Sequence, residues 1–143
     1  MDTASSPCQI VLAEDNPADV GLVRLALRDH GVHCELRVIP DGEAAVTFIN
    51  GLDLDGKIPC PDLLLLDMHL PKRDGNEILR HLRASERCAQ TPVVVLTSSE
   101  AASDRHNAEK NAAIHYFRKS ASLDEFLLLG KIVKEVLSRA PSC

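Results

Sequence analysis

Aromatic residues, basic charge and long apolar segments are all scarce in this chain of 143 residues. Only 3% of the residues are aromatic, which argues against a surface that stacks nucleic-acid bases. The net charge of −5 argues against a basic nucleic-acid interface. No segment approaches the roughly 20 apolar residues of a membrane-spanning helix, and the N-terminus lacks the apolar core of a signal peptide. The sequence therefore predicts neither a nucleic-acid partner nor a membrane partner.

Closely spaced cysteine pairs are also absent. A disulfide framework or a zinc site usually shows such pairs, and an odd number of cysteines argues against full pairing. We therefore predict small isolated side chains, an exposed terminal cysteine and a reducing cytoplasm as the compartment. The five cysteines are Cys8, Cys34, Cys60, Cys88 and Cys143.

The length suits one domain with a single hydrophobic core. Residues 1–7 are predicted to form a flexible leader and residues 8–140 the domain, with no output domain. Short apolar runs alternate five times with helical segments, and this alternation favours a doubly wound α/β fold around a five-stranded parallel sheet. The strands are expected over residues 8–13, 34–39, 62–66, 92–96 and 113–117.

Several helix ends carry local signals. Asn16 and Pro17 are typical of an N-cap followed by the first helical residue, and Gly31 suits the helix end. Ser122 and Glu125 fit a capping box that opens the last helix, which runs to about Arg139. A fourth helix is predicted over residues 100–110. Residues 34–39 alternate between apolar and polar side chains, which predicts an edge strand.

Polar residues lie at the ends of four of the apolar runs. Ligands of an open parallel sheet bind outside the carboxyl ends of its strands. One edge would therefore gather three carboxylates, a hydroxyl and an ammonium, which is a cation site beside an anion site. Mg2+ prefers such hard oxygen ligands, so the pattern predicts phosphate chemistry with Mg2+. The residues are Glu14, Asp15, Asp67, Thr97 and Lys119.

Each of these residues also has a structural interpretation. Glu14 and Asp15 precede a helix, where acids are favourable, and Thr97 suits a helix cap. A lysine such as Lys119 is usually a surface residue. Asp67 is harder to explain structurally, because it follows four leucines and an ionised carboxylate beside the core needs a partner. The combination favours a functional site.

Five stretches together resemble the receiver domain of two-component response regulators. They span about residues 8–139, and residues 14–19 and 70–75 are most similar to the single-domain group that includes phytochrome-associated regulators. The resemblance implies the flavodoxin-like strand order 2-1-3-4-5 with five helices. The stretches are residues 11–17, 61–67, 70–75, 92–97 and 116–119.

The resemblance also implies roles for individual residues. Asp67 would accept a phosphoryl group from a sensor histidine kinase or a phosphotransfer protein. The chain would have no enzyme activity beyond its Mg2+-dependent self-phosphorylation and autodephosphorylation. Mg2+ would be held by Glu14, Asp15, Asp67 and the backbone carbonyl of His69. The phosphoryl oxygens would contact Thr97, the backbone of Ser98 and Lys119, while Thr97 and Tyr116 would form the switch.

Three departures from the family pattern stand out. Ser120 follows Lys119 where the family usually has a proline on a cis bond, which costs about 2.5–4 kcal/mol before any other residue. Asn111 replaces a glycine, which is a mild change because Asn tolerates left-handed geometry. The segment 99–110 is unusually polar, so we expect the fourth helix to be loosely held.

Output would depend on protein contacts. The apolar face of the last helix is predicted to pack on the core, while Leu128 and Ile132 lie opposite. These two residues are either ordinary surface aliphatics or part of a homodimer interface formed by the fourth helix, fifth strand and fifth helix. The core face comprises Leu123, Phe126, Leu129, Val133, Val136 and Leu137.

Three alternatives stay open. A phosphohydrolase of the haloacid-dehalogenase type would use Asp67 as nucleophile, but such enzymes usually carry an acid two residues later, where this chain has His69. A receiver-like module that is never phosphorylated is a second alternative, which Ser120 keeps open. A flavin-binding protein is disfavoured because no phosphate-binding loop follows the first strand.

Overall fold

The structure is a computed structural model that describes residues 8–97 and 115–139. One parallel sheet has the order β2-β1-β3-β4-β5, so the predicted fold class and strand order are confirmed. The predicted leader 1–7, the helix over 100–110 and Asn111 lie outside the described residues. The strands are β1 (Cys8–Ala13), β2 (Cys34–Ile39), β3 (Leu63–Asp67), β4 (Val93–Thr97) and β5 (His115–Arg118). The described helices are α1 (Pro17–Asp29), α2 (Gly42–Leu54), α3 (Gly75–Arg83) and α5 (Leu123–Arg139).

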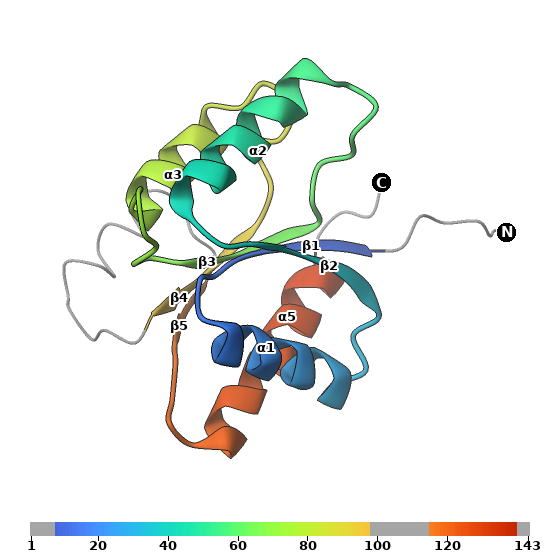
Figure 1. Cartoon of the computed structure of the whole chain (residues 1–143). Helices are drawn as coiled ribbons and strands as arrows, with labels where there is room; N and C mark the ends of the chain where they lie inside the picture. The colour runs from blue at the N-terminus through green and yellow to red at the C-terminus, as the bar shows by residue number, and fades with distance from the viewer. Residues whose placement is uncertain (1–7, 98–114, 140–143) are drawn as a thin grey trace, which may run out of the picture.

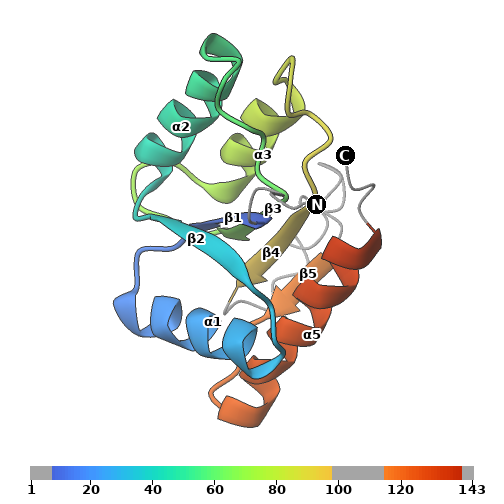
Figure 2. The ribbon, with the colours of Figure 1, turned by 90° about the vertical axis from the view of Figure 1, so that its right-hand side faces the viewer.

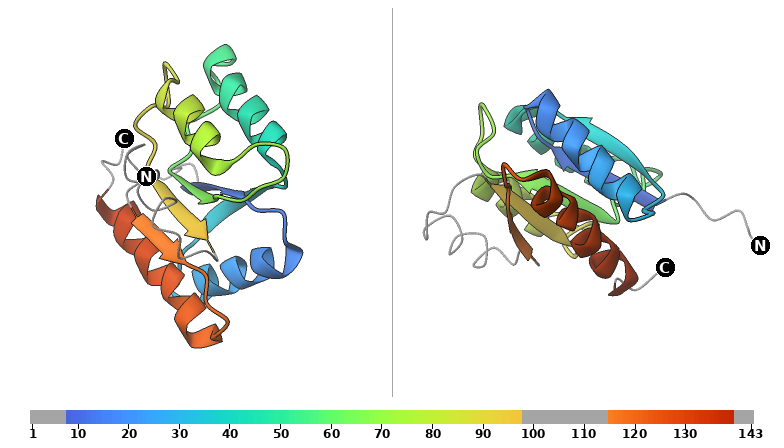
Figure 3. Two further views of the ribbon diagram at one scale, coloured as in Figure 1. Left: turned by 90° about the vertical axis from the view of Figure 1, so that its left-hand side faces the viewer. Right: turned by 90° about the horizontal axis from the view of Figure 1, so that it is seen from below.

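Helices cover both faces of the sheet. Helices α2 and α3 lie on one face, and α1 and α5 lie on the other (Figures 1 and 2). Seen from below, α1 and α5 run side by side under the sheet (Figure 3). Strand β1 serves both layers, because Ile10 and Leu12 join the core beneath α1 and α5 while Val11 and Ala13 join the other core. Alternating faces along a strand produce this division, which explains why the central strands are apolar on both faces.

Side-chain caps begin the helices where the sequence predicts them. The side chain of Asn16 accepts a hydrogen bond from the backbone N–H of Ala18 at 2.9 Å, which confirms the predicted start of α1. Ser122 Oγ accepts from the N–H of Glu125 at 3.4 Å before α5. The carboxylate of Glu125 accepts from Ser120 Oγ at 3.0 Å, so it caps the preceding loop as well.

The strands end later than the apolar runs predict. Asp67 and Thr97 are the last residues of β3 and β4, and β5 continues to Arg118. Their backbones stay in register across the sheet, with Asp67 opposite Leu96 and Thr97 opposite Arg118. Hydropathy showed where apolar side chains stop, whereas backbone pairing decides where a strand stops. The polar side chains are therefore anchored on the sheet itself.

The prediction of isolated cysteines was wrong for four of the five. Disulfides join Cys8 to Cys34 and Cys60 to Cys88, while Cys143 lies outside the described residues. The partners are 26 and 28 residues apart, so no short spacing reveals them. Cys8 and Cys34 face each other through the parallel register of β1 and β2. Tertiary pairing, rather than local sequence, brings these thiols together.

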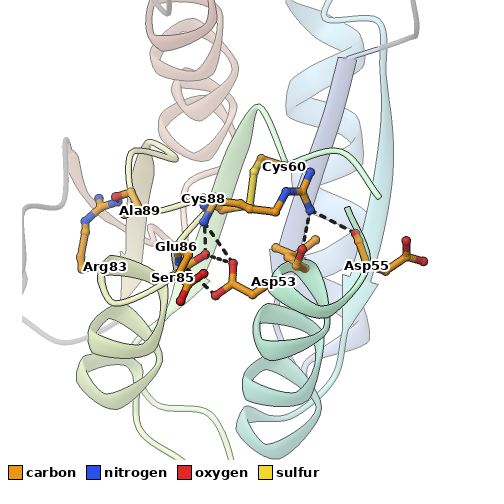
Figure 4. Close-up of a disulfide and its surroundings, with 10 residues drawn as sticks. Asp53, Asp55, Cys60, Arg83, Ser85, Glu86, Cys88 and Ala89 are labelled. Carbon is orange, nitrogen blue, oxygen red and sulfur yellow. Dashed lines mark hydrogen bonds between the residues drawn. A yellow bond between two sulfur atoms is a disulfide. The ribbon is translucent and has the colours of Figure 1, made fainter. Parts of the chain in front are cut away.

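The second disulfide lies at the amino end of β3, away from the polar strand ends. It joins the loop before β3 to the connection between α3 and β4 (Figure 4). Beside it, the carboxylate of Asp53 accepts hydrogen bonds from Ser85 Oγ at 2.6 Å and from the N–H of Glu86 at 3.0 Å. These bonds tie the α3–β4 connection to the end of α2.

The predicted core face of α5 is confirmed for Phe126, Leu129, Val133 and Val136, which are buried. Leu123 is 49% exposed and not buried as predicted, because it is the first residue of the helix, where α5 begins away from the sheet (Figure 1). On the opposite side, Leu128 is 52% exposed. Ile132 packs partly against the core beneath α1 and α5, so the helix exposes Leu128 without an equally exposed Ile132.

Within residues 8–97 and 115–139, no helix combines the length and hydropathy needed to cross a bilayer.

Candidate functional site

The carboxyl ends of the central strands meet at one edge of the sheet and bring the predicted residues together. Glu14 directly follows β1, and its N–H donates to the carbonyl of Ile39 at the end of β2, at 3.0 Å. Lys119 directly follows β5, and its N–H donates to the carbonyl of Thr97 at 2.7 Å. The two backbones are therefore fixed on either side of β3, which ends at Asp67.

Three carboxylates form a compact group at this edge. Glu14, Asp15 and Asp67 each place one oxygen within 4.8 Å of the others. Glu14 and Asp67 are buried and Asp15 is exposed, so the group is open to solvent on one side. Mg2+ accepts carboxylate oxygens and keeps several water ligands. The donor set therefore fits a hard divalent cation.

The ammonium of Lys119 bridges this group to a fourth carboxylate. Its Nζ lies 2.6 Å from Glu14 Oε1, 2.8 Å from Asp19 Oδ2 and 3.2 Å from Asp67 Oδ2. The Lys119 side chain is only 12% exposed, and that of Glu14 is fully buried. Charge-assisted hydrogen bonds of this kind are stronger than neutral ones.

The site carries more carboxylates than ammonium groups, and the pKa values of both Glu14 and Lys119 are raised. Burial raises the pKa of Glu14 from 4.5 to about 7, with a further increase from the charge of Asp67, although the hydrogen bond from Lys119 opposes the shift. Burial lowers the pKa of Lys119, but hydrogen bonds to Asp19 and Glu14 outweigh this effect and raise it above its usual value. Lys119 is therefore charged at neutral pH, and the site is prepared for a further cation.

The loop after β3 holds Asp67 from the other side. Asp67 Oδ1 accepts a hydrogen bond from the N–H of His69 at 2.9 Å. The N–H of Gly75 donates to the carbonyl of Met68 at 3.0 Å, and a Cβ at Gly75 would collide with Met68. The loop thus folds tightly onto α3. The predicted role of the His69 carbonyl stays a prediction.

The predicted switch residues lie on adjacent strands. Thr97 is fully buried at the end of β4. Tyr116 is half-buried on β5 and packs against the core under α2 and α3. In the sheet, Tyr116 is aligned with Val95, two residues before Thr97. Ser98 lies outside the described residues, so its predicted backbone contact stays a prediction.

Residues 10–129 match the response regulator receiver domain family. The chain belongs to this family. It is 35% identical to response regulator Rcp1 of Synechocystis sp. over 124 residues, which cover 87% of this chain and 84% of Rcp1. Its structure resembles that of the phosphorylated cyanobacterial phytochrome response regulator RcpA, with a TM-score of 0.83 and 34% identity over 96% of this chain and 100% of RcpA. The Mn2+-bound form of Rcp1 gives a TM-score of 0.78 and 30% identity over 94% and 97% of the two chains.

These similarities confirm the predicted family and its likeness to phytochrome-associated regulators. The receiver is a signalling domain of two-component systems and not a classical enzyme. The phosphohydrolase alternative is therefore not supported.

The sequence interpretation gave no role to one acid of the receiver site, Asp19. It lies in the first turn of α1, four residues after Asp15, and bonds to Lys119. Acids are common in the first turn of a helix, which makes a structural interpretation sufficient from sequence. The signal in the sequence that could have indicated a role for Asp19 is its position, because α1 starts at the sheet edge where the other carboxylates lie.

One departure from the receiver pattern is Ser120, which follows Lys119 where the family usually has a proline on a cis bond. Among the described residues no peptide bond is cis, so Lys119 and Ser120 are joined in trans. Ser120 Oγ accepts from the N–H of Ser122 at 3.0 Å and donates to Glu125. The segment after the lysine is therefore organised by the start of α5.

Proposed function

We propose that this receiver accepts a phosphoryl group on Asp67, with Mg2+, from a sensor histidine kinase or a phosphotransfer protein. It then signals through protein contacts that depend on phosphorylation. The observation that carries this proposal is the position of Asp67, whose carboxylate lies both in the three-carboxylate group and 3.2 Å from the Lys119 ammonium. The phosphorylated form of RcpA and the Mn2+-bound form of Rcp1 support the proposal by analogy.

In the proposed reaction, an oxygen of Asp67 attacks the phosphorus of a phosphohistidine while the phosphorus–nitrogen bond breaks and the imidazole leaves. Glu14, Asp15, Asp67 and the His69 carbonyl would hold Mg2+, which would neutralise charge between the carboxylate and the phosphoryl group. Lys119 supplies a positive point charge, and Thr97 and the Ser98 backbone donate to phosphoryl oxygens. Positioning and charge neutralisation suffice for this transfer.

The proposed output begins with the charge of the phosphoryl group, roughly −1.5 to −2 at neutral pH. Thr97 and Lys119 are joined by a backbone hydrogen bond of 2.7 Å, so movement of either strand end toward the phosphoryl group involves the other. Tyr116 lies on the same strand pair and is proposed to change its packing with Thr97. The phosphoryl group can shift the equilibrium between the inactive and the active state only by the difference in its binding free energy for the two states. A nearly complete shift needs a difference of about 5.5 kcal/mol.

Incubation with acetyl phosphate and Mg2+ is expected to add one phosphoryl group to the wild-type chain and none to Asp67→Asn. The side-chain amide of asparagine lacks the negatively charged, nucleophilic oxygen of a carboxylate and cannot form the acyl phosphate. Intact mass spectrometry measures the adduct directly. Asp62→Asn is the matched control, because Asp62 is an exposed acid that immediately precedes β3, at the other end of the strand from Asp67.

A phosphoryl adduct on Asp67→Asn would show that a residue other than Asp67 is the acceptor. A folded wild-type chain that stays unmodified with acetyl phosphate and with a second phosphodonor would favour the module that is never phosphorylated.

We further propose that the surface of β5 and α5 forms a homodimer contact after phosphorylation, with Leu128 at its centre and Ile132 at its margin. Leu128→Glu is expected to keep the phosphorylated receiver monomeric, because a buried glutamate at an apolar contact is costly. Multi-angle light scattering before and after phosphorylation measures the mass. Leu25→Glu on α1 is the control, since Leu25 is 39% exposed outside this surface. A wild-type chain that is monomeric in both states would contradict the proposal.

A further inference from the structure

Lys119 has one acidic partner that belongs neither to the three-carboxylate group nor to the phosphoryl acceptor. Asp19 Oδ2 lies 2.8 Å from Lys119 Nζ. Its side chain is 22% exposed, so this ion pair is largely shielded from solvent. Asp19 comes from α1, whereas the other two partners, Glu14 and Asp67, come from the sheet edge.

The ammonium of a lysine has three N–H donors. In this structure its three carboxylate partners account for all three. Glu14 and Asp67 also contribute oxygens to the candidate metal group, which does not include Asp19. A divalent cation bound there would draw on those oxygens and would repel the nearby ammonium. Of the three ion pairs of Lys119, only the one with Asp19 would then keep its full strength.

Among the residues that the structure describes, the hydrogen bonds of Lys119 to other groups do not fix the direction of its side chain. Its backbone N–H is bonded to the Thr97 carbonyl, which places the Cα but leaves the side-chain torsions open. The next residue, Ser120, is bonded to Ser122 and Glu125 at the start of α5. The carboxylates therefore orient the ammonium, and Asp19 is the one that a bound cation leaves available.

We propose that Asp19 is a positioning residue that keeps the Lys119 ammonium beside Asp67 when a cation and a phosphoryl group occupy the site. This inference rests on the proposed function. The amino end of α1 carries a positive partial charge that favours an ionised aspartate in the first turn, so Asp19 is itself held in place. The donor that Asp67 releases then becomes available to a phosphoryl oxygen.

The test measures binding of the phosphoryl analogue beryllofluoride by isothermal titration calorimetry, with Mg2+ in excess. Asp19→Asn is expected to raise the Kd by roughly tenfold or more, the effect of losing one charge-assisted hydrogen bond. In a Lys119→Met background the same substitution is expected to have almost no effect, because Asp19 acts through the lysine. Asp19→Glu is expected to retain most of the affinity. Asp29→Asn, the same charge change at the other end of α1, is expected to bind like the wild type.

A merely structural or long-range electrostatic role of Asp19 would weaken binding equally with and without Lys119. That result, or equal Kd values for Asp19→Asn and the wild type, would overturn the proposal. A second measurement separates it from the proposed function. In the Mg2+-bound protein labelled with 15N-lysine and free of beryllofluoride, the Lys119 ammonium signal is expected to be protected from exchange and to lose that protection in Asp19→Asn. If the wild type fails to bind beryllofluoride, the proposed function fails, and an unchanged ammonium signal in Asp19→Asn would overturn this inference as well.

Discussion

Replacing Lys119 by methionine is expected to lower the free energy of unfolding of the metal-free protein by about 3 kcal/mol at about pH 8, because breaking a buried ion pair leaves charge uncompensated. The substitution removes the ammonium that lies between Glu14, Asp19 and Asp67. Denaturant unfolding followed by circular dichroism measures the change, since the chain has no tryptophan. Lys131→Met is the control, an exposed lysine on α5 expected to leave stability nearly unchanged.

The loss is expected to shrink toward about pH 5. Glu14 has a pKa of 4.5 in its usual state and about 7 in the folded protein, mainly because it is buried. Between these values the folded state keeps a proton that the unfolded chain releases, so the contribution of Glu14 to stability falls as the pH rises. Without Lys119 the hydrogen bond that opposes this shift is lost, so the penalty at high pH grows.

Adding Mg2+ is expected to restore most of the stability of Lys119→Met, because the ion returns positive charge to the same carboxylates. Glu14→Gln in the Lys119→Met background is expected to remove much of the pH dependence. A Lys119→Met protein as stable as the wild type at about pH 8 without metal would contradict the ion-pair geometry described above.

Gly130→Ala is expected to destabilise the fold by about 3 kcal/mol through overpacking between α1 and α5. A Cβ at Gly130 would collide with the backbone oxygen of Ala26 and lie 2.5 Å from Cδ2 of His30. A backbone oxygen within a helix cannot move aside, so the helices must separate. Urea unfolding followed by circular dichroism measures the loss.

Gly21→Ala is the matched control with the opposite sign. Gly21 lies within α1, and apart from its chain neighbours and the nearby backbone of its own helix, nothing described lies within 4 Å of the position of a Cβ there. Alanine is expected to raise stability by about 0.5–1 kcal/mol, because it favours the helix over glycine. Equal effects at the two positions would show that α1 and α5 do not pack as described.

Local patterns were sufficient for most of the architecture. The continuous apolar run before Asp67 predicted a strand buried on both faces, and β3 is fully buried. The pair Asn16–Pro17 predicted the start of α1, because a cap depends on neighbouring residues alone. Parallel strands end at a common edge, so the gathering of Glu14, Asp67 and Lys119 also followed from the order of the elements.

Long-range packing decided what the local patterns left open. The sequence by itself determined the strands, their polar ends and the family, since these depend on short-range periodicity and on residues at fixed positions along the chain. Only the tertiary structure decided that Cys8 joins Cys34, that Asp19 bonds to Lys119 and that Gly130 must lack a side chain while Gly21 need not. Each of these contacts joins surfaces of different elements. Their distance in space is set by register and helix packing, which no local pattern encodes.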